Sequence, residues 1–572
     1  MGSMSHYSVP SEAAKVLQNG IVSHSQHSSL PTEAKALASR IHFTGQEKPR
    51  LAVSWRFAES TSALLGLEAI LINVLLGRRY NLEAQDVTID TDHASLFIMS
   101  PYLVELEPDA DADIVPTSLF ESQAKFAKYF PNRDIHGMAS TPLRRGVSNI
   151  YRAGDGRYVH THASLDPTPS LNAMGLPADD PRVTNQEECW AVLKDTVASK
   201  TADEWDGVLG EDAKQACTIC LDAEQYKASA QGKANAGVGL YRIHHQASDS
   251  LPKGWWPATA LTSPTRPLAG LKVLDLTRVI ASPTMTRGLA ELGASVMRVT
   301  APHLPDYSGL LPDLNWGKWN CSLDLRKAED LAKLQNLLKE ADVVVNGYRP
   351  GVLDKYGLSH EKVFELGKRR GRGFIYVREN CFGWEGGPLD HRSGWQPISD
   401  AHSGVSFGYG RSMGLDEPVT PIFPHSDFAT GIAGTCAVLQ ALIERGEKGG
   451  NFLIDTALNY ANQWLVKHVG EYPKEVWEDV WAANGKPVFR HWHNTGVILP
   501  AHLKLCAQQG LFEKRHFEVR KSGALGGLPM RMVKPVLQYL DGHVELGFNV
   551  GTRGNGVDAA RWPEDLLNEV VE

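Results

Sequence analysis

The chain has 572 residues, which is too long for a single hydrophobic core and predicts two to four domains. A hydrophobic content of 42% and a charged content of 22% are typical of an ordinary globular protein. The formal net charge of -8, without a dense stripe of lysine and arginine, argues against a nucleic-acid-binding protein.

Cysteine and histidine usage gives a first indication of the compartment and of metal chemistry. No secretory signal pattern opens the chain, and its seven cysteines are an odd number spread thinly, so we expect a cytoplasmic protein. Cys217 and Cys220 form a lone CxxC without a second pair, which we interpret as structural. His160 and His162 form an HxH pair that no nearby ligand completes, so no metal site is expected.

The first hundred residues contain one strongly apolar stretch. Residues 1–50 are polar and are expected to be a partly ordered lead-in. The run 63–77 is interrupted by Glu68 and Asn73 and is too short to cross a bilayer, so it predicts a buried helix and no membrane partner.

An internal repeat links this run to a later part of the chain. Glu59 is followed by small residues at a constant offset from those that follow Asp427, and an Ile-Asp-Thr sequence comes after each helix, at 89–91 and 454–456. The pattern predicts a partly duplicated helix–strand unit. Glu59 replaces the aspartate in the first copy, and its longer side chain would misplace the carboxylate, so that copy is expected to be scaffold.

The middle of the chain has α+β character up to a proline-rich linker. Residues 148–162 predict two strands joined by an Asp-Gly turn. Helices are predicted at 185–198, with Thr184 as its cap, and at 201–209. Residues 248–267 are expected to be a linker.

The segment 268–380 alternates apolar strands with amphipathic helices, which predicts a doubly wound parallel sheet covered on both faces. Ser282 and Pro283 are expected to cap a helix after the first strand. A nucleotide-bearing ligand should bind at the carboxyl ends of the strands. No GxGxxG follows the first strand and no GxxxxGK[ST] occurs, which argues against NAD and P-loop chemistry.

The stretch 424–431 has the form of a carboxylate, Asp427, on a short loop that enters a buried helix rich in small residues. An aspartate in this place can also be a simple helix N-cap, and the stretch alone leaves both interpretations open. Residues 473–572 return to α+β character, with a strand predicted at 542–548 and no motif that indicates chemistry.

Several stretches resemble the class III CoA-transferases, the CaiB/BaiF family, which also includes 2-methylacyl-CoA racemases. They occur in the family's order at 267–283, 290–302, 315–325, 348–353, 382–388 and 427–431. Residues 51–247 resemble the second half of the same family's chain, so the order here is a second half, a first half and a divergent tail. A tandem fusion with degraded copies and a permuted subunit both remain possible explanations.

The resemblance implies an α/β fold, with a doubly wound, Rossmann-like CoA-transferase III domain and a smaller α+β domain. The expected segments are the lead-in (1–50), a degenerate second-half segment with the small domain (51–247), the linker (248–267), the Rossmann-like segment (268–472) and a divergent tail (473–572). In the family, dimers interlock, so a homodimer or an intrachain pseudo-dimer is expected.

The resemblance also implies a reaction and a site. Asp427 would be the nucleophile that attacks an acyl-CoA thioester, giving an aspartyl anhydride and then an aspartyl-CoA thioester, from which a carboxylic acid takes the CoA. Gly431 would leave room for the thioester. No permanently bound cofactor is expected. The residues expected along the CoA groove are Val279, Ile280, Ala281, Arg298, Leu323, Arg326, Tyr348, Arg349 and Lys355.

Two other functions remain open at this point. A racemase or epimerase of 2-substituted acyl-CoA needs an acid and a base on opposite faces of the substrate. Trp395 stands where the racemases have a histidine, and His402 or His425 would have to substitute. Gly347 and Gln396 also depart from the family's usual Asn and Asp. The second alternative is a family member that has lost CoA transfer.

Overall fold

The computed structural model describes residues 7–109, 112–567 and 569. Its largest sheet has seven strands in the order β10-β9-β8-β11-β12-β13-β7, all parallel except β7. The strands are β7 (Arg242–Gln246), β8 (Lys272–Leu276), β9 (Ser295–Thr300), β10 (Lys318–Ser322), β11 (Val343–Asn346), β12 (Ile375–Asn380) and β13 (Asn451–Ala457). The parallel α/β fold predicted from the sequence is confirmed.

Helices cover both faces of this sheet because successive strand residues point to opposite sides. Val343 and Val345 pack in one core with α12 (Ala281–Glu291) and α18 (His425–Lys448). Val344 packs in a second core with α14 (Ala328–Glu340) and α15 (His360–Arg370). The continuous apolar character of the strands therefore follows from burial on both faces.

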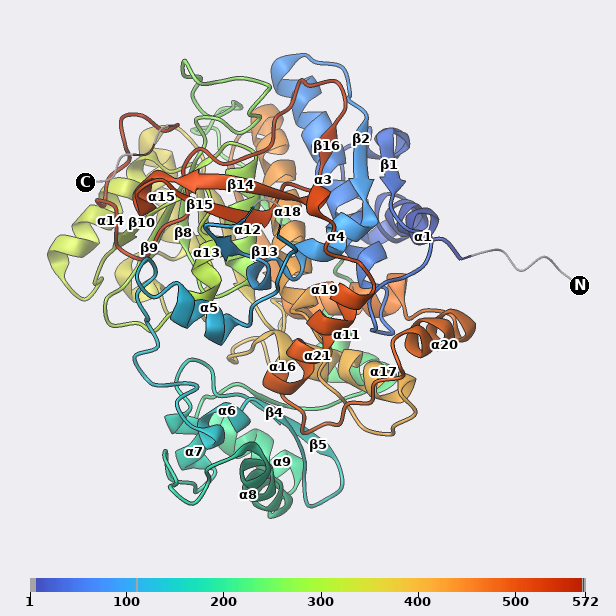
Figure 1. The fold of residues 1–572 in the computed structure, drawn as a ribbon. Coiled ribbons are helices and arrows are strands. Elements are labelled where there is room, and N and C mark those ends of the chain that lie inside the picture. The colour runs from blue at the N-terminus through green and yellow to red at the C-terminus, as the bar shows by residue number, and fades with distance from the viewer. Residues whose placement is uncertain (1–6, 110–111, 568, 570–572) are drawn as a thin grey trace, which may run out of the picture.

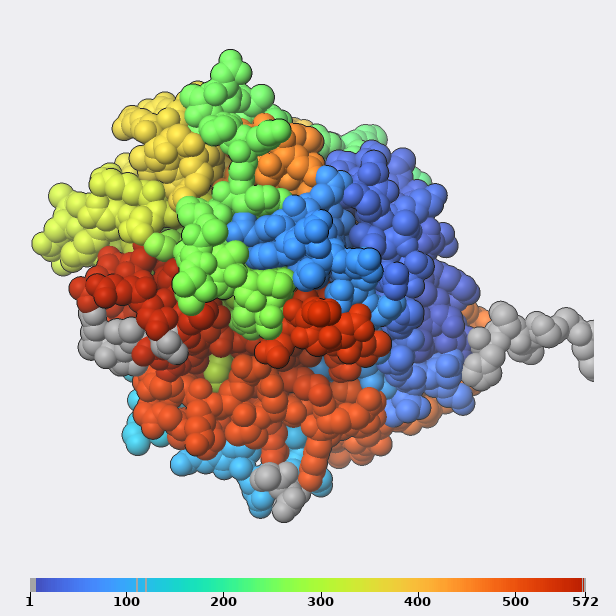
Figure 2. Space-filling view, turned by 90° about the horizontal axis from the view of Figure 1, so that it is seen from above, coloured from blue at the N-terminus to red at the C-terminus, as the bar shows by residue number. Residues whose placement is uncertain are grey.

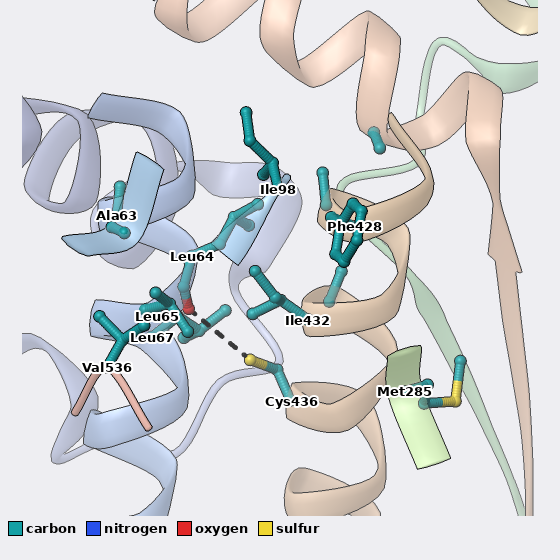
Figure 3. Close-up of a cluster of buried hydrophobic side chains, with 14 of the residues drawn as sticks. Ala63, Leu64, Leu65, Leu67, Ile98, Met285, Phe428, Ile432, Cys436 and Val536 are labelled. Carbon is teal, nitrogen blue, oxygen red and sulfur yellow. Dashed lines mark hydrogen bonds between the residues drawn. The ribbon is translucent and has the colours of Figure 1, made fainter. Parts of the chain in front are cut away.

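The helix α18 is held between two partners. On one side lies α3 (Phe57–Tyr80), where Leu64 and Leu67 face Ile432 and Cys436 (Figure 3). On its other side lies α12, whose Met285 packs against α18. Both 24-residue helices are long and apolar enough to cross a membrane, but 94% and 100% of their most apolar windows are buried in the structure. The prediction of a buried helix over 63–77 is confirmed.

The segment expected to be a partly ordered lead-in is built into the fold from residue 7 onward, and residues 1–6 lie outside the described residues. α1 (Val9–Lys15) packs on α3, and α2 (Ala34–Leu37) follows. β1 (Ile41–Thr44) pairs with β2 (Val87–Asp90), to which β16 (Gln538–Tyr539) also pairs. Composition misled here, because the few apolar residues of this polar segment are the ones that are buried.

A smaller α+β unit surrounds the three-stranded antiparallel sheet of β4 (Asn149–Arg152), β5 (Tyr158–Thr161) and β6 (Cys217–Ile219), and it forms the lower part of Figure 1. It has its own core. Its helices are α6 (Pro142–Gly146), α7 (Thr168–Ala173), α8 (Gln186–Ala198) and α9 (Ala202–Trp205). The predicted hairpin is confirmed. The cap of α8 is Asn185 rather than Thr184, because the Asn185 side chain accepts from the backbone N–H of Glu188.

The linker and the tail run over the surface of the sheet domain. In Figure 2 the green residues that include the linker lie between the blue N-terminal part and the yellow part of the chain. Trp256 of the linker is buried, and its indole N–H donates to the carbonyl of Ala269. In the tail, α20 (Lys474–Ala483) and α21 (Thr495–Gln508) precede a sheet of β14 (Phe517–Ser522), β15 (Leu528–Val533) and β3 (Glu105–Leu106).

The prediction of a strand at 542–548 is wrong. The structure has no strand there, and backbone donors of this stretch reach distant carbonyls: Glu545 N–H donates to Thr265 and Gly547 N–H to Glu291. The alternation of apolar residues instead lets Val544 pack into the main core.

The contact between α12 and α18 generates a first prediction. A Cβ added at Gly431 would lie 2.6 Å from the Thr284 Cβ and 2.9 Å from the Ala281 carbonyl oxygen. Gly431→Ala should therefore destabilise the protein by about 1–3 kcal/mol through overpacking, measured as a lower midpoint of urea unfolding. Gly207→Ala is the control, because a Cβ there would meet no atom within 4 Å. Equal midpoints for the two variants would contradict the packing argument.

Candidate active site

A cavity of about 460 Å³ opens at the carboxyl ends of β8, β11 and β12. This is the edge at which parallel α/β sheets bind their ligands. We call it the Asp427 cavity. Its lining from the sheet domain is Arg278, Val279, Ile280, Ala281, Leu304, Pro305, Gly347, Tyr348, Arg349, Val352, Glu379, Ser393, Gly394, Trp395, Asp427 and Leu458. The small α+β unit adds Ser164, Leu165, Asp166, Pro169, Lys214 and Gln215.

Asp427 lies in the first turn of α18, not on the loop before it, which corrects the expectation from the sequence. Its side chain does not cap the helix, and the N-cap residue is Pro424. Among the described residues, none donates a hydrogen bond to the Asp427 carboxylate, although the residue is only 9% exposed. A carboxylate at a helix N-terminus, without a protein partner and facing a cavity, is free to react with a ligand.

Two further carboxyl groups share this buried environment. Burial, together with Glu379 and Asp400, raises the pKa of Asp427 well above its usual range. Burial raises the pKa of Glu379 to about 8, and Ser282 Oγ donates to Glu379 Oε2 at 3.1 Å. Burial also raises the pKa of Asp400 to about 6, while Asn462 and Ser426 donate to it at 2.8 and 3.1 Å. Burial of these carboxyl groups keeps some of them protonated at neutral pH.

The contact between Ser282 and Glu379 also explains an incorrect prediction about α12. The helix begins at Ala281 without a side-chain cap, so Ser282 does not cap it. Gly431, expected to leave room for a thioester, instead faces Thr284 and Ala281 of α12. This glycine allows close helix packing, and that packing holds the first turn of α18 against the loop 278–281.

Five of the residues expected along the CoA groove line the Asp427 cavity: Val279, Ile280, Ala281, Tyr348 and Arg349. The four others lie elsewhere. Leu323 lines a separate surface cavity formed with residues 556–561. The Arg326 guanidinium donates to both Asp324 oxygens at 2.8 Å, and the Lys355 ammonium lies 5.1 Å from the centre of the Tyr356 ring.

Arg298 is buried and already paired within the protein. Its guanidinium donates to Asp306 Oδ2 and to Asn555 Oδ1, both at 2.7 Å. Asn555 comes from the tail, more than two hundred residues away in the chain, which is why a local motif could not predict this contact. The Arg298 side chain therefore holds the tail and does not reach the Asp427 cavity.

Sequence reasoning missed three side chains of the site: Glu379, Asp400 and Arg278. Arg278 lies beside Val279 in a stretch that the sequence had marked, and its Nε is buried without a partner in the described part of the chain. Glu379 was detectable in principle, because it follows a strand predicted at 373–377 and so had to lie at the carboxyl edge. Only the folded arrangement could bring Asp400 close.

The two histidines considered for an epimerase do not line the Asp427 cavity. His402 is buried and hydrogen-bonded to the Asn459 amide at 3.0 Å. His425 is buried, stacks on Phe57 with ring centroids 4.2 Å apart, and bonds Ser60 Oγ at 2.7 Å. Burial lowers the pKa of each imidazole to about 3. Both act as structural groups in the core.

Glu59, the counterpart of Asp427 in the repeat, occupies the same third position of its helix but a different environment. It is fully buried and accepts hydrogen bonds from the Tyr7 and Tyr472 hydroxyls, the latter at 3.2 Å. Its carboxylate is thus enclosed by protein and is not part of the Asp427 cavity.

The cysteines and the HxH pair singled out in the sequence have structural roles. All seven cysteines, including Cys217 and Cys220, are free and buried. His162 stacks on Trp395 with ring centroids 5.1 Å apart, and the Trp395 indole N–H donates to Ser164 Oγ at 3.1 Å. These contacts fasten the small unit to the wall of the Asp427 cavity.

Comparisons with known proteins bear on this site. Residues 268–480 match the model of CoA-transferase family III. The chain is 45% identical to acetyl-coenzyme A transferase nodX of Hypoxylon pulicicidum, over 100% of this chain and 96% of that protein. It is 28% identical to an acyl-CoA transferase of Gibberella moniliformis, over 89% of this chain and 88% of that protein. A solved structure of a CaiB/BaiF family protein from Brucella suis is 26% identical, covers 40% of this chain and 60% of its own, and has a TM-score of 0.31.

The buried Glu379 generates a prediction about stability and pH. Its folded pKa of about 8 lies above the ordinary 4.5. Between these values the unfolded chain loses the proton and the folded chain keeps it, so Glu379 lowers stability progressively as pH rises. Glu379→Gln should therefore gain about 3 kcal/mol relative to wild type between pH 5 and pH 8, measured by chemical unfolding at both pH values. Glu329→Gln, at an exposed site on α14, is the matched control and should show no such gain.

Proposed function

This chain belongs to CoA-transferase family III and is a CoA-transferase, and from that premise we propose that it moves CoA from an acyl-CoA thioester to a carboxylic acid by covalent catalysis on Asp427. One observation carries the proposal: the Asp427 carboxylate has no protein partner among the described residues and lines a cavity whose lining also includes Arg278, Arg349 and Lys214. The near-complete match to a relative named as an acetyl-coenzyme A transferase supports the same reaction class.

In the reaction that we propose, every covalent intermediate forms on the side chain of Asp427. An Asp427 oxygen attacks the thioester carbon of the donor. The carbon–sulfur bond breaks, CoA departs as a thiolate, and Asp427 and the donor acyl group form a mixed anhydride. The thiolate then attacks the Asp427 carbonyl, which releases the donor acid and leaves an aspartyl-CoA thioester. The acceptor carboxylate attacks that thioester, which releases CoA thiolate and forms a second anhydride. The thiolate then attacks the acceptor's carbonyl carbon in this anhydride. The new acyl-CoA leaves, and Asp427 is regenerated.

The side chains around Asp427 suit the parts of this substrate. Arg278 and Arg349 provide guanidinium groups for the CoA phosphates, and Lys214 of the small unit adds an ammonium group at the same cavity. The Arg278 guanidinium donates to the Pro305 carbonyl at 2.5 Å and lies 5.2 Å from the centre of the Tyr348 ring, and these contacts hold it at the cavity. A protonated Glu379 can donate a hydrogen bond to an oxygen that gains negative charge during attack.

The duplicated unit supports a proposal about assembly. α3 is followed by β2 and α4 (Thr91–Phe97), as α18 is followed by β13 and α19 (Leu458–Trp464). The first helix of each unit has 24 residues, and the two helices pack together. We infer that the chain is an intrachain pseudo-dimer with one working site. We also place it in the cytoplasm, in keeping with its free, buried cysteines.

The covalent step can be tested directly. Wild-type protein mixed with a panel of acyl-CoAs should gain one hydroxylamine-sensitive adduct per chain at Asp427, read by intact-protein and peptide mass spectrometry. Asp427→Asn should lose the adduct and at least about 1000-fold in transfer rate, because no nucleophile remains. Glu59→Gln, at the counterpart position, should keep the adduct at Asp427.

Two results would overturn this mechanism. An adduct at another residue, or full transfer activity in Asp427→Asn, would exclude Asp427 as the nucleophile. Exchange of the α-hydrogen of a 2-methylacyl-CoA with deuterated water, in the absence of an adduct, would instead establish an epimerase.

The distribution of arginines gives a separate prediction about CoA affinity. Arg278→Met should weaken the binding of CoA by about tenfold or more, because a charge-assisted hydrogen bond to phosphate is lost. Arg326→Met should leave the affinity unchanged, since that guanidinium is paired with Asp324 outside the Asp427 cavity. Titration calorimetry with CoA compares the two variants. A larger effect at Arg326 would favour the sequence-based groove over the observed one.

A further inference from the structure

A second and larger cavity lies next to the Asp427 cavity. It has a volume of about 670 Å³ and is lined by the residues before α18, the first turns of α21, and parts of the N-terminal half and the small unit. We call it the apolar cavity. Volumes of about 300–1,000 Å³ are those of pockets that enclose a small organic ligand.

The walls of the apolar cavity are mostly hydrocarbon. The apolar part of the lining includes Met138, Ile422, Phe423, Val497, Ile498 and Leu499. These side chains cannot satisfy phosphates, sugars or other strongly polar groups. Such a lining favours an occupant that buries apolar surface.

The lining also has polar members: its two cations are Arg144 and the exposed Arg145, and Gln186 Nε2 is buried without a partner in the described part of the chain. Arg144 is the most buried cation there, and it is already paired: its Nε donates to Asp179 at 3.1 Å, and both terminal nitrogens donate to Thr168 at 3.3 Å. An anionic group deep in the cavity would therefore have to compete with partners that are in place.

The apolar cavity adjoins the nucleophile. Ile280 lines both cavities. Phe423 and Pro424 line the apolar cavity and immediately precede the helix whose first turn carries Asp427. Tyr102, another lining residue, lies close enough that the charge of Asp427 contributes to the raised pKa of its hydroxyl. A molecule in the apolar cavity can therefore present one end to Asp427.

From this geometry we propose that the apolar cavity holds the hydrocarbon body of a bulky hydrophobic carboxylic acid, with its carboxyl group or thioester carbon directed towards Asp427. The cavity has room for roughly 20 non-hydrogen atoms if each takes about the 30 Å³ of a water molecule in the liquid. Small acids such as acetate would leave most of it empty.

The walls of the apolar cavity come largely from outside the segment that matches the family model. Residues 102–186 and 494–500 supply much of the lining, and both lie outside the segment 268–480 that matches the family model. The tail residues 494–500 thus add to walls that come from the segment resembling the family's second half. This inference rests on the proposed transferase function for the direction of the carboxyl group, but not for the binding of the hydrocarbon.

Binding can be measured without catalysis. The fluorescent long-chain fatty acid cis-parinaric acid should bind both wild type and Asp427→Asn with similar affinity. Val497→Trp and Ala139→Trp, which fill the cavity from different segments, should each weaken binding at least tenfold. Val519→Trp is the control, because Val519 is 51% exposed on β14 and is not part of the lining, and it should bind as wild type does. Circular dichroism and melting temperatures confirm that each variant is folded.

Displacement and turnover complete the test. Displacement of cis-parinaric acid by deoxycholic acid would support a polycyclic body, and displacement by hexadecanoic acid alone would support a linear one. In transfer assays, the ratio of kcat/KM for hexadecanoic or deoxycholic acid to that for acetic acid should fall at least tenfold in Val497→Trp.

The outcomes separate this inference from the proposed function. Specific binding without any transfer would support the apolar site and count against the transferase proposal. Transfer to acetic acid, without binding of either bulky acid, would overturn the inference and leave the transferase proposal standing. Binding that the two tryptophan variants do not weaken would also overturn it.

Discussion

The close approach of α12 to α18 is the contact on which the active site depends. Because Gly431 has no side chain, Thr284 and the Ala281 carbonyl lie against the α18 backbone. The loop 278–281, which begins α12, and the first turn of α18 are thereby fixed to one another. On the opposite side α3 supports α18 over much of its length. The Asp427 carboxylate, held in the first turn of a helix packed on two sides, has little freedom to move, which suits a reaction that needs exact alignment.

The same burial creates an electrostatic conflict that the site uses. Burial raises the pKa of Asp427, Glu379 and Asp400, and the pKa of Asp427 is raised further by the charges of Glu379 and Asp400. A carboxyl group that ionises with difficulty is more basic and hence more nucleophilic once it does. The cations at the cavity, Arg278 and Lys214, lie where an anionic substrate would approach, so substrate binding itself can shift this balance.

The sequence predicted the features that depend on local patterns. Apolar strands alternating with helices correctly indicated the doubly wound sheet, and the Asp-Gly turn indicated the hairpin of β4 and β5. Val279 and Tyr348, placed by resemblance, lie at the cavity because loops at the carboxyl ends of parallel strands converge. Features set by distant parts of the chain were not predictable. The Arg298 guanidinium donates a hydrogen bond to Asn555 of the tail. The stretch 542–548 forms no strand because its backbone N–H groups donate to carbonyls far away in the chain.

The strand β7 has a consequence for how the protein is made. It precedes every other strand of its sheet in the chain, yet it pairs only with β13, through residues 451–455. During synthesis at about 5–20 residues per second, β7 leaves the ribosome roughly 10–40 s before its partner. Throughout that interval an unpaired strand edge and its apolar neighbours are exposed in the cell. The sheet therefore gains its pairing between β7 and β13 only after translation has passed residue 455.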